Sequence, residues 1–251
     1  MKIVRFQHEE TIRFGALQGE RIGIIYGDIF GEYRVSEEFI PLASVQLLSP
    51  CSITKAVCVG LNYHQHAREM GLDLPANPLL FLKPSSALNR PGGRIQYPAA
   101  SSSLHYEAEL AVVIKKEAKN VKAEEAADYI LGCTCANDVT ARDLQLQDGQ
   151  WTRGKSFDTF LPLGPCIATG INGDHLNIKL YLNGELKQNS NTSDLIFKIP
   201  ELVEFISKVM TLYPGDVILT GTPSGVGPMK AGDTVTVELE GIGALTNFIF
   251  R

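Results

Sequence analysis

The stretch Leu104–Ile114, LHYEAELAVVI, has the composition of a buried β-strand but carries two carboxylates. Successive side chains of a strand point to opposite faces, so Glu107 and Glu109 share one face. Burying two adjacent carboxylates costs several kcal/mol unless a cation compensates. A solvent-exposed strand face would tolerate both, and the pair alone favours that simpler interpretation. Ala111 and Val113 continue the same face, however, and make it partly apolar.

A third carboxylate lies further along the chain. Asp138 ends the predicted strand CTCAND, residues 133–138, where the chain turns into VTARDLQ. Three carboxylates with no nearby set of His and Cys are typical of a site for a hard cation such as Mg²⁺ or Mn²⁺. The alternative for Asp138 is the N-cap of a following helix, and the spacing does not decide between the two.

The first 50 residues predict a small β subdomain. Short strands are expected at KIVRF, RFGALQ and RIGIIYG, separated by turn signals such as QGER. The segment LLSPCSITKA, which carries Pro and Ser, is the expected boundary. The sequence therefore predicts a subdomain over residues 1–50 and a catalytic domain over residues 51–251.

The larger part also consists mainly of strands. NIKLYLNGELKQ predicts a hairpin with its turn at Asn183–Gly184, and IPELVEFISKVM predicts an amphipathic helix. Further helices are expected at YHQHAREM, capped by Asn62, and at AEEAADYIL, ended by Gly132. Because strands mostly follow strands, we predict an α+β, β-dominated fold and not a doubly wound parallel sheet.

Composition excludes several classes of protein. The net charge of −5 over 251 residues gives no basic footprint for nucleic acid. No apolar run reaches the roughly 18 residues that a membrane span needs. The alternating N-terminus reads as a strand and not as a signal peptide, so the five cysteines are expected to be reduced thiols in a cytoplasmic protein. Cys133 and Cys135 lack a second pair for zinc and are expected to pack like small hydrophobic residues.

Two further patterns could carry chemistry. His66 and Glu69 are three residues apart on a predicted helix, so they share a face and can form a general-base pair. An exposed polar helix face is the alternative. Lys155, in RGKSFDTFLPLGP, is a candidate buried cation for a carboxylate substrate, with a surface lysine as the alternative.

These patterns together resemble the fumarylacetoacetate hydrolase family. The resemblance covers about residues 57 to 240 in order, through VGLNYHQHAREM, PLLFLKPSSAL, HYEAELAVVI, NDVTARDLQ, RGKSFDTFLPLGP, LYLNGELKQ and GDVILTGTPSGVGPM. Any one stretch is modestly specific, whereas the ordered set is highly specific. The resemblance implies a mixed β-sandwich roll, a homodimer and a divalent metal, Mg²⁺ or Mn²⁺.

The resemblance also assigns roles to residues. An E-x-E pair and a downstream Asp hold the metal, and they correspond to Glu107, Glu109 and Asp138. A His-x-x-Glu pair in a lid activates water, and it corresponds to His66 and Glu69. The family's active-site lysine corresponds to Lys155. Thr222 corresponds to a position that contacts the substrate carboxylate.

One departure from the pattern concerns the substrate. Fumarylacetoacetases proper have an additional Asp ligand upstream of the glutamate pair, whereas residues 84–106 contain no Asp or Glu. The chain is therefore more similar to the short members of the family. Arg142, together with Arg90 and Arg94, is a candidate for binding a second substrate carboxylate, although a surface or structural role is the simpler interpretation of each.

We expect a metal-dependent enzyme that acts on small 2-oxo or β-diketo acids through a metal-bound enolate. The His66/Glu69 pair favours C–C bond hydrolysis of the acylpyruvate hydrolase type, with oxaloacetate decarboxylation also open. The alternatives are an isomerase/decarboxylase of the 2-hydroxyhepta-2,4-diene-1,7-dioate type, an oxaloacetate tautomerase and a 2-hydroxydienoate hydratase. A non-catalytic metabolite-binding protein is the remaining class.

Overall fold

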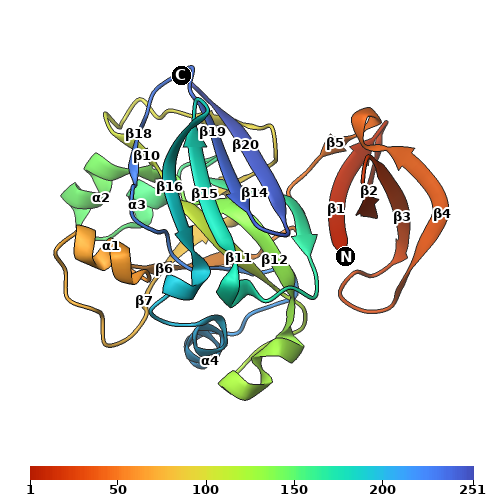
Figure 1. Cartoon of the computed structure of the whole chain (residues 1–251), viewed down its shortest axis with the longest axis horizontal. Coiled ribbons are helices and arrows are strands. Elements are labelled where there is room, and N and C mark those ends of the chain that lie inside the picture. Colours follow the sequence, from red (N-terminus) through yellow and green to blue (C-terminus); the bar gives the residue numbers. More distant parts are fainter.

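The N-terminal strands form an antiparallel meander beside the main body of the molecule (Figure 1). The computed structural model describes all residues, 1–251. The meander consists of β1 (Lys2–His8), β2 (Thr11–Gln18), β3 (Arg21–Gly27) and β4 (Tyr33–Pro41), with β5 (Gln46–Leu47) beside β1. The three predicted strands are confirmed, whereas β4 was missed because most of its side chains are exposed. The predicted boundary near residue 50 stays a prediction, since β1 also pairs with β14 (Leu161–Ala168).

The main sheet continues from β14 through strands that are far apart in the sequence. Its order is β14-β12-β11-β17-β6-β7, and only β17 and β6 are parallel within this run. The bounds are β6 (Lys55–Gly60), β7 (Leu79–Pro84), β8 (Leu88–Asn89, beside β14), β11 (Ala108–Ile114), β12 (Ile130–Asn137) and β17 (Val217–Leu219). Strands from the N-terminal and C-terminal halves of the chain thus pair in one sheet.

A five-stranded sheet packs on one face of this main sheet. It has the order β16-β15-β19-β20-β9, and Figure 1 shows its strands crossing over β11, β12 and β14. The bounds are β9 (Arg94–Gln96), β15 (Asn177–Leu182), β16 (Glu185–Asn191), β19 (Thr234–Leu239) and β20 (Gly243–Phe250). A small third sheet combines β10 (Leu104–Tyr106), β13 (Thr140–Ala141) and β18 (Gly227–Met229). This β-dominated α+β architecture confirms the predicted fold class.

The helices are short and lie at the edges of the sheets. They are α1 (His64–Glu69), α2 (Arg142–Asp148), α3 (Thr152–Lys155) and α4 (Ile199–Val209), with 3₁₀ segments at Leu42–Ser44, Ser85–Ala87, Ala123–Tyr129, Gly173–His175 and Thr192–Asp194. None of them has the length and apolarity required to cross a membrane. Two further predictions are confirmed. The hairpin turns at Asn183–Gly184, where both residues have positive φ, and helix α4 forms over the predicted segment.

Two helix predictions were wrong in detail. Asn62 caps no helix; instead its side chain bonds Phe197 and the carbonyl of Thr220, and so links α1 to two distant segments. The segment 123–131 forms a 3₁₀ helix that ends at Tyr129, and Gly132 lies inside β12. Gly132 is required there because a Cβ atom would lie 2.3 Å from the carbonyl oxygen of Ala168 on β14.

Strand β11 is buried on both faces. Ala108, Leu110, Val112 and Ile114 belong to the core cluster between the two large sheets. Ala111 and Val113 belong to a second cluster on the other face, with residues of β6, β12, β14 and β17. Cys133 and Cys135 pack in the first cluster as small hydrophobic residues, and burial raises the pKa of Cys133 to about 12.

Asp216 fixes the start of the parallel β6–β17 pair. Its buried carboxylate accepts hydrogen bonds from the backbone N–H groups of Thr54, Lys55 and Tyr213, and from the Thr54 hydroxyl. The Lys55 ammonium lies 2.5 Å from the same carboxylate. Burial alone would raise the pKa of Asp216, but the bonds from Lys55 and Thr54 outweigh it and hold the pKa below its usual value.

We expect Asp216→Asn to lower the free energy of unfolding by about 3 kcal/mol at pH 7 in urea denaturation. A lowered folded-state pKa contributes stability above the unfolded pKa of about 4, and this contribution is lost as the pH falls through the folded value. The difference between the two proteins should therefore shrink below about pH 4. Asp158→Asn, at an exposed position, is the control. A difference that is absent at pH 7, or unchanged at low pH, contradicts this account.

Candidate active site

The predicted strand Leu104–Ile114 is divided by Glu107 into two strands that belong to different sheets. Strand β10 ends at Tyr106, and β11 begins at Ala108. At the joint, the Glu107 N–H donates to the side-chain oxygen of Asn137, and the Asp138 N–H donates to the Glu107 carbonyl. These two bonds hold the end of β12 against the joint, so residues 31 positions apart lie side by side.

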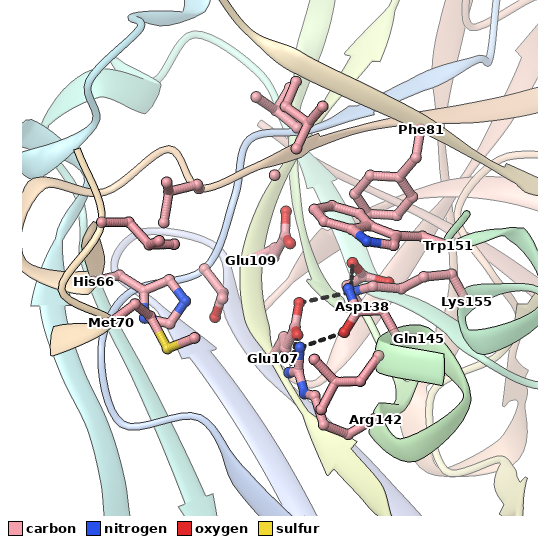
Figure 2. Close-up of a pocket in the computed structure, with 17 residues that line it drawn as sticks. His66, Met70, Phe81, Glu107, Glu109, Asp138, Arg142, Gln145, Trp151 and Lys155 are labelled. Carbon is pink, nitrogen blue, oxygen red and sulfur yellow. Dashed lines mark hydrogen bonds and ion pairs between the residues drawn. The ribbon is translucent and has the colours of Figure 1, made fainter. Parts of the chain in front are cut away.

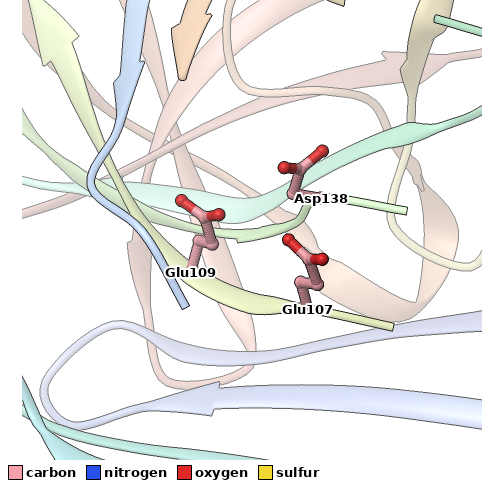
Figure 3. Close-up of side chains that lie close together, drawn as sticks. All are labelled: Glu107, Glu109 and Asp138. Atoms are coloured by element: carbon pink, nitrogen blue, oxygen red, sulfur yellow. The ribbon is translucent and has the colours of Figure 1, made fainter. Parts of the chain in front are cut away.

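Three carboxylates meet at this joint. One oxygen from each of Glu107, Glu109 and Asp138 lies within 4.8 Å of the others, and all three residues are buried (Figure 3). A solvent-exposed strand face is therefore excluded for the glutamate pair. The helix-cap alternative for Asp138 is also wrong, because α2 begins at Arg142 and is preceded by Ala141.

Three cationic side chains surround the carboxylates. The Lys155 ammonium lies 2.9 Å from Glu107 and 2.6 Å from Asp138, and Lys155 is only 2 % exposed, so the surface-lysine alternative is wrong. Lys83 is fully buried and forms an ion pair with Asp138. Arg142 forms an ion pair with the other oxygen of Glu107. Each cation thus offsets a buried negative charge that would otherwise be unfavourable.

These pairs shift the ionisation of the groups involved. Burial raises the pKa of Glu107, but Lys155 and Arg142 more than compensate and lower it to about 2. Burial opposes the charge of Lys155 as well, yet Asp138 and Glu107 raise its pKa. Burial lowers the pKa of Lys83 by more than the charge of Asp138 raises it, so the pKa of Lys83 lies below its usual value. The site thus contains an ionised Glu107 and a protonated Lys155 at neutral pH.

Glu109 differs from the other two carboxylates because it has no cationic side chain of its own. Its hydrogen bond comes from the backbone N–H of Gly221 at 2.7 Å. Burial, followed by the charges of Asp138 and Glu107, raises its pKa well above the usual range. A divalent cation beside the three oxygens would stabilise the ionised form of Glu109, and a donor set of carboxylates alone suits Mg²⁺ or Mn²⁺. An oxygen that accepts from an ammonium group keeps lone-pair capacity for a metal. The residues present therefore fit such an ion.

His66 and Glu69 form a pair on α1. The Nδ1 atom of His66 lies 3.0 Å from the Glu69 carboxylate, which also accepts a hydrogen bond from the backbone N–H of Gly225 at 3.1 Å. His66 lines the cavity above the carboxylates, whereas Glu69 lies behind it and is partly exposed. The predicted pairing is thus present, and Gly225 additionally ties it to the loop after β17.

The carboxylates form the floor of a cavity of about 230 Å³. His66 and Met70 lie on one side of this cavity in Figure 2, and Phe81 and Trp151 lie on the other. The two aromatic rings pack edge to face, with centroids 5.2 Å apart. The remaining lining residues are Val59, Gly60, Leu61, Leu72, Leu79, Arg142, Gln145, Leu146, Lys155 and Thr222.

The remaining candidates divide into two groups. Thr222 and Arg142 line the cavity, and the Thr222 hydroxyl accepts a hydrogen bond from Gln188. Arg90 and Arg94 do not line it; Arg90 bonds the carbonyl of Pro91, and Arg94 lies over the ring of Phe250.

Sequence reasoning missed Lys83 and Trp151. Lys83 is a single lysine at the end of the apolar strand β7, and no sequence pattern marks it as part of the site. Trp151 is the only tryptophan in the chain, and it lies four residues before Lys155. No local pattern predicts that its ring faces the cavity.

Comparison with known protein families identifies the family of the chain. The family model described as fumarylacetoacetate (FAA) hydrolase C-terminal matches residues 55–250. The chain belongs to the fumarylacetoacetate hydrolase family. A second model, Rv2993c-like N-terminal, matches residues 1–50.

Similar members of the fumarylacetoacetate hydrolase family carry out different reactions. A crystal structure of 2-hydroxyhepta-2,4-diene-1,7-dioate isomerase from Mycobacterium marinum superimposes with a TM-score of 0.94 at 44 % identity, over 100 % of this chain and 98 % of that one. Oxaloacetate tautomerase Fahd2a from Rattus norvegicus is 43 % identical over 83 % of this chain and 70 % of its own length. Maleylpyruvate hydrolase from Sphingobium sp. SYK-6, solved with manganese(II) and pyruvate, gives a TM-score of 0.84 at 31 % identity, over 100 % of this chain and 99 % of that one.

The absence of a cationic partner at Glu109 leads to a prediction about metal binding. Mn²⁺ at about 100 times its dissociation constant should raise the free energy of unfolding by about 2.7 kcal/mol, and EDTA should reverse this. Glu109→Gln should abolish the stabilisation because it removes one anionic ligand. Glu117→Gln, at an exposed position, is the matched control, and thermal or urea denaturation measures the effect. Equal stabilisation of the Glu109→Gln variant refutes the assignment.

Proposed function

We propose that this member of the fumarylacetoacetate hydrolase family is a divalent-metal-dependent enzyme that cleaves a C–C bond of a small 2-oxo acid by hydrolysis. The observation that carries the proposal is the convergence of three buried carboxylates on the floor of a cavity that His66 also lines. A carboxylate-only donor set with an adjacent general base is suited to metal-assisted attack by water.

Glu107, Glu109 and Asp138 would hold the Mg²⁺ or Mn²⁺ ion. When bound there, the cation supplies Lewis-acid polarisation of the carboxylate and 2-oxo groups of the substrate. Lys155 uses two of its three N–H bonds on Glu107 and Asp138. Its third N–H is available to a substrate oxygen on which negative charge develops.

His66 is the proposed general base. Because Glu69 accepts at Nδ1, the neutral ring keeps its proton there and leaves Nε2 as the proton acceptor. Nε2 takes a proton from water as the water oxygen adds to the distal carbonyl carbon. The C–C bond then breaks, and its electron pair goes to the carbon next to the 2-oxo group. The proton held at Nε2 is returned to that carbon, so that a carboxylic acid and a shorter 2-oxo acid are released.

Isomerisation or tautomerisation of the same kind of acid is the second candidate. The relatives support it, since one is a dioate isomerase and another an oxaloacetate tautomerase. The residues are the same, and His66 would move a proton between two atoms of the substrate without activating water. Product analysis separates the two, because hydrolysis alone divides the carbon skeleton.

We expect metal-dependent turnover of at least one acid in a panel of acetylpyruvate, oxaloacetate and a 2-hydroxymuconate-type dienoate. The reaction should stop in excess EDTA and resume with Mg²⁺ or Mn²⁺, because the carboxylates alone cannot polarise the 2-oxo group. NMR of the products identifies the reaction. Failure of every acid in the panel to react with metal present would end the proposal.

Removal of the general base provides a separate prediction. His66→Asn should lower kcat by about 10²- to 10⁴-fold, with a smaller change in KM, since the residue acts on the proton and not on binding of the 2-oxo group. His8→Asn, in the N-terminal meander, is the control. Steady-state kinetics on the best substrate of the panel measures both. A His66→Asn variant with unchanged kcat excludes the assigned base.

A further inference from the structure

The cavity has two chemically different halves. Its floor carries the three carboxylates and the Lys155 ammonium. Its outer part is formed by uncharged side chains, which include the aromatic rings of Phe81 and Trp151 (Figure 2). Met70, Leu72, Leu79 and Leu146 complete this outer part. A ligand whose polar end occupies the floor therefore directs its other end at apolar groups.

Trp151 is held firmly in this position. Its ring packs edge to face on Phe81 and lies against Gly60, where even a Cβ atom would come within 2.6 Å of the ring. A ring fixed in this way presents the same flat apolar surface to every ligand without loss of side-chain entropy on binding.

The cations that line the cavity are already paired. Lys155 is bound to Glu107 and Asp138, and Arg142 to Glu107 and the Gln145 side chain. His66 is neutral in the proposed mechanism and is paired with Glu69. Lys155 and Arg142 both lie against the carboxylates of the floor, so a second carboxylate at the far end of a substrate would lose its hydration among the apolar side chains of the outer part, which is strongly unfavourable.

We infer that the outer half of the cavity selects 2-oxo acids with an uncharged, apolar tail over diacids of the same length, and that Trp151 determines this specificity. The inference rests on the proposed function, since it assumes that the 2-oxo acid end binds at the carboxylate floor. It narrows the substrate class to 2-oxo monoacids whose distal carbonyl carries an uncharged alkyl or aryl group.

A matched pair of ligands tests the inference by binding alone. 2-Oxohexanoate and 2-oxoadipate have the same number of carbons and differ in a terminal methyl or carboxylate group. Because the chain contains a single tryptophan and it lines the cavity, intrinsic fluorescence in the presence of Mg²⁺ reports binding directly. We expect 2-oxohexanoate to bind at least about tenfold more tightly. Equal affinity, or tighter binding of 2-oxoadipate, overturns the inference.

A change of charge at the cavity mouth provides a second test. Leu146 is exposed on α2 and lines the cavity, so Leu146→Lys adds a free cation without disturbing a core. This variant should bind 2-oxoadipate about tenfold more tightly and so reduce the preference. Leu186→Lys, at an exposed leucine on β16 outside the cavity, is the matched control and should leave it unchanged. An equal gain in affinity for 2-oxoadipate in both variants, or no gain in the Leu146→Lys variant, contradicts the inference.

The Trp151→Ala variant and pyruvate separate this inference from the proposed function. In isothermal titration calorimetry with Mg²⁺, the Trp151→Ala variant should bind 2-oxohexanoate about tenfold more weakly than the wild type. Its affinity for pyruvate, which has no tail, should be unchanged. Pyruvate binding with no tail preference in the wild type overturns the inference and leaves the proposed function intact. No metal-dependent binding of any 2-oxo acid overturns both.

Discussion

Three buried carboxylates lie side by side where β11 begins and β12 ends, and the surrounding residues compensate most of their charge. Lys155, Lys83 and Arg142 pair with Glu107 and Asp138, whereas Glu109 has a single backbone donor, the Gly221 N–H. An uncompensated carboxylate in such a place is costly, and a bound divalent cation removes the cost. The positions of Lys155, Lys83 and Arg142 around the floor of the cavity follow from this constraint.

Strand periodicity was enough to place Glu107 and Glu109 on one face, because alternation is a local property. It could not establish that this face is buried, since the covering residues come from β6, β12, β14 and β17. Lys83 was missed for a similar reason: a single lysine at the end of an apolar strand has no pattern, and its partner Asp138 is 55 residues away. The hairpin and α4 were predicted correctly because turn and helix signals are local. Formation of a homodimer stays a prediction.

The cavity joins segments that the fold holds in different ways. The floor is held by the main sheet, in which one substitution disturbs paired charges and two core clusters. The walls come from short helices and loops, such as α1 with His66 and the segment with Trp151. Side chains there can change without altering the three carboxylates. The relatives include an isomerase, a tautomerase and a hydrolase.

The central claim is that Glu107, Glu109 and Asp138 together bind one divalent cation. Anomalous diffraction from crystals grown with Mn²⁺ tests it most directly, since the signal locates the ion independently of activity. We expect one strong peak at about 2.0–2.2 Å from an oxygen of each of the three carboxylates. A cavity without such a peak at saturating Mn²⁺, or a peak bound by other residues, would contradict the account.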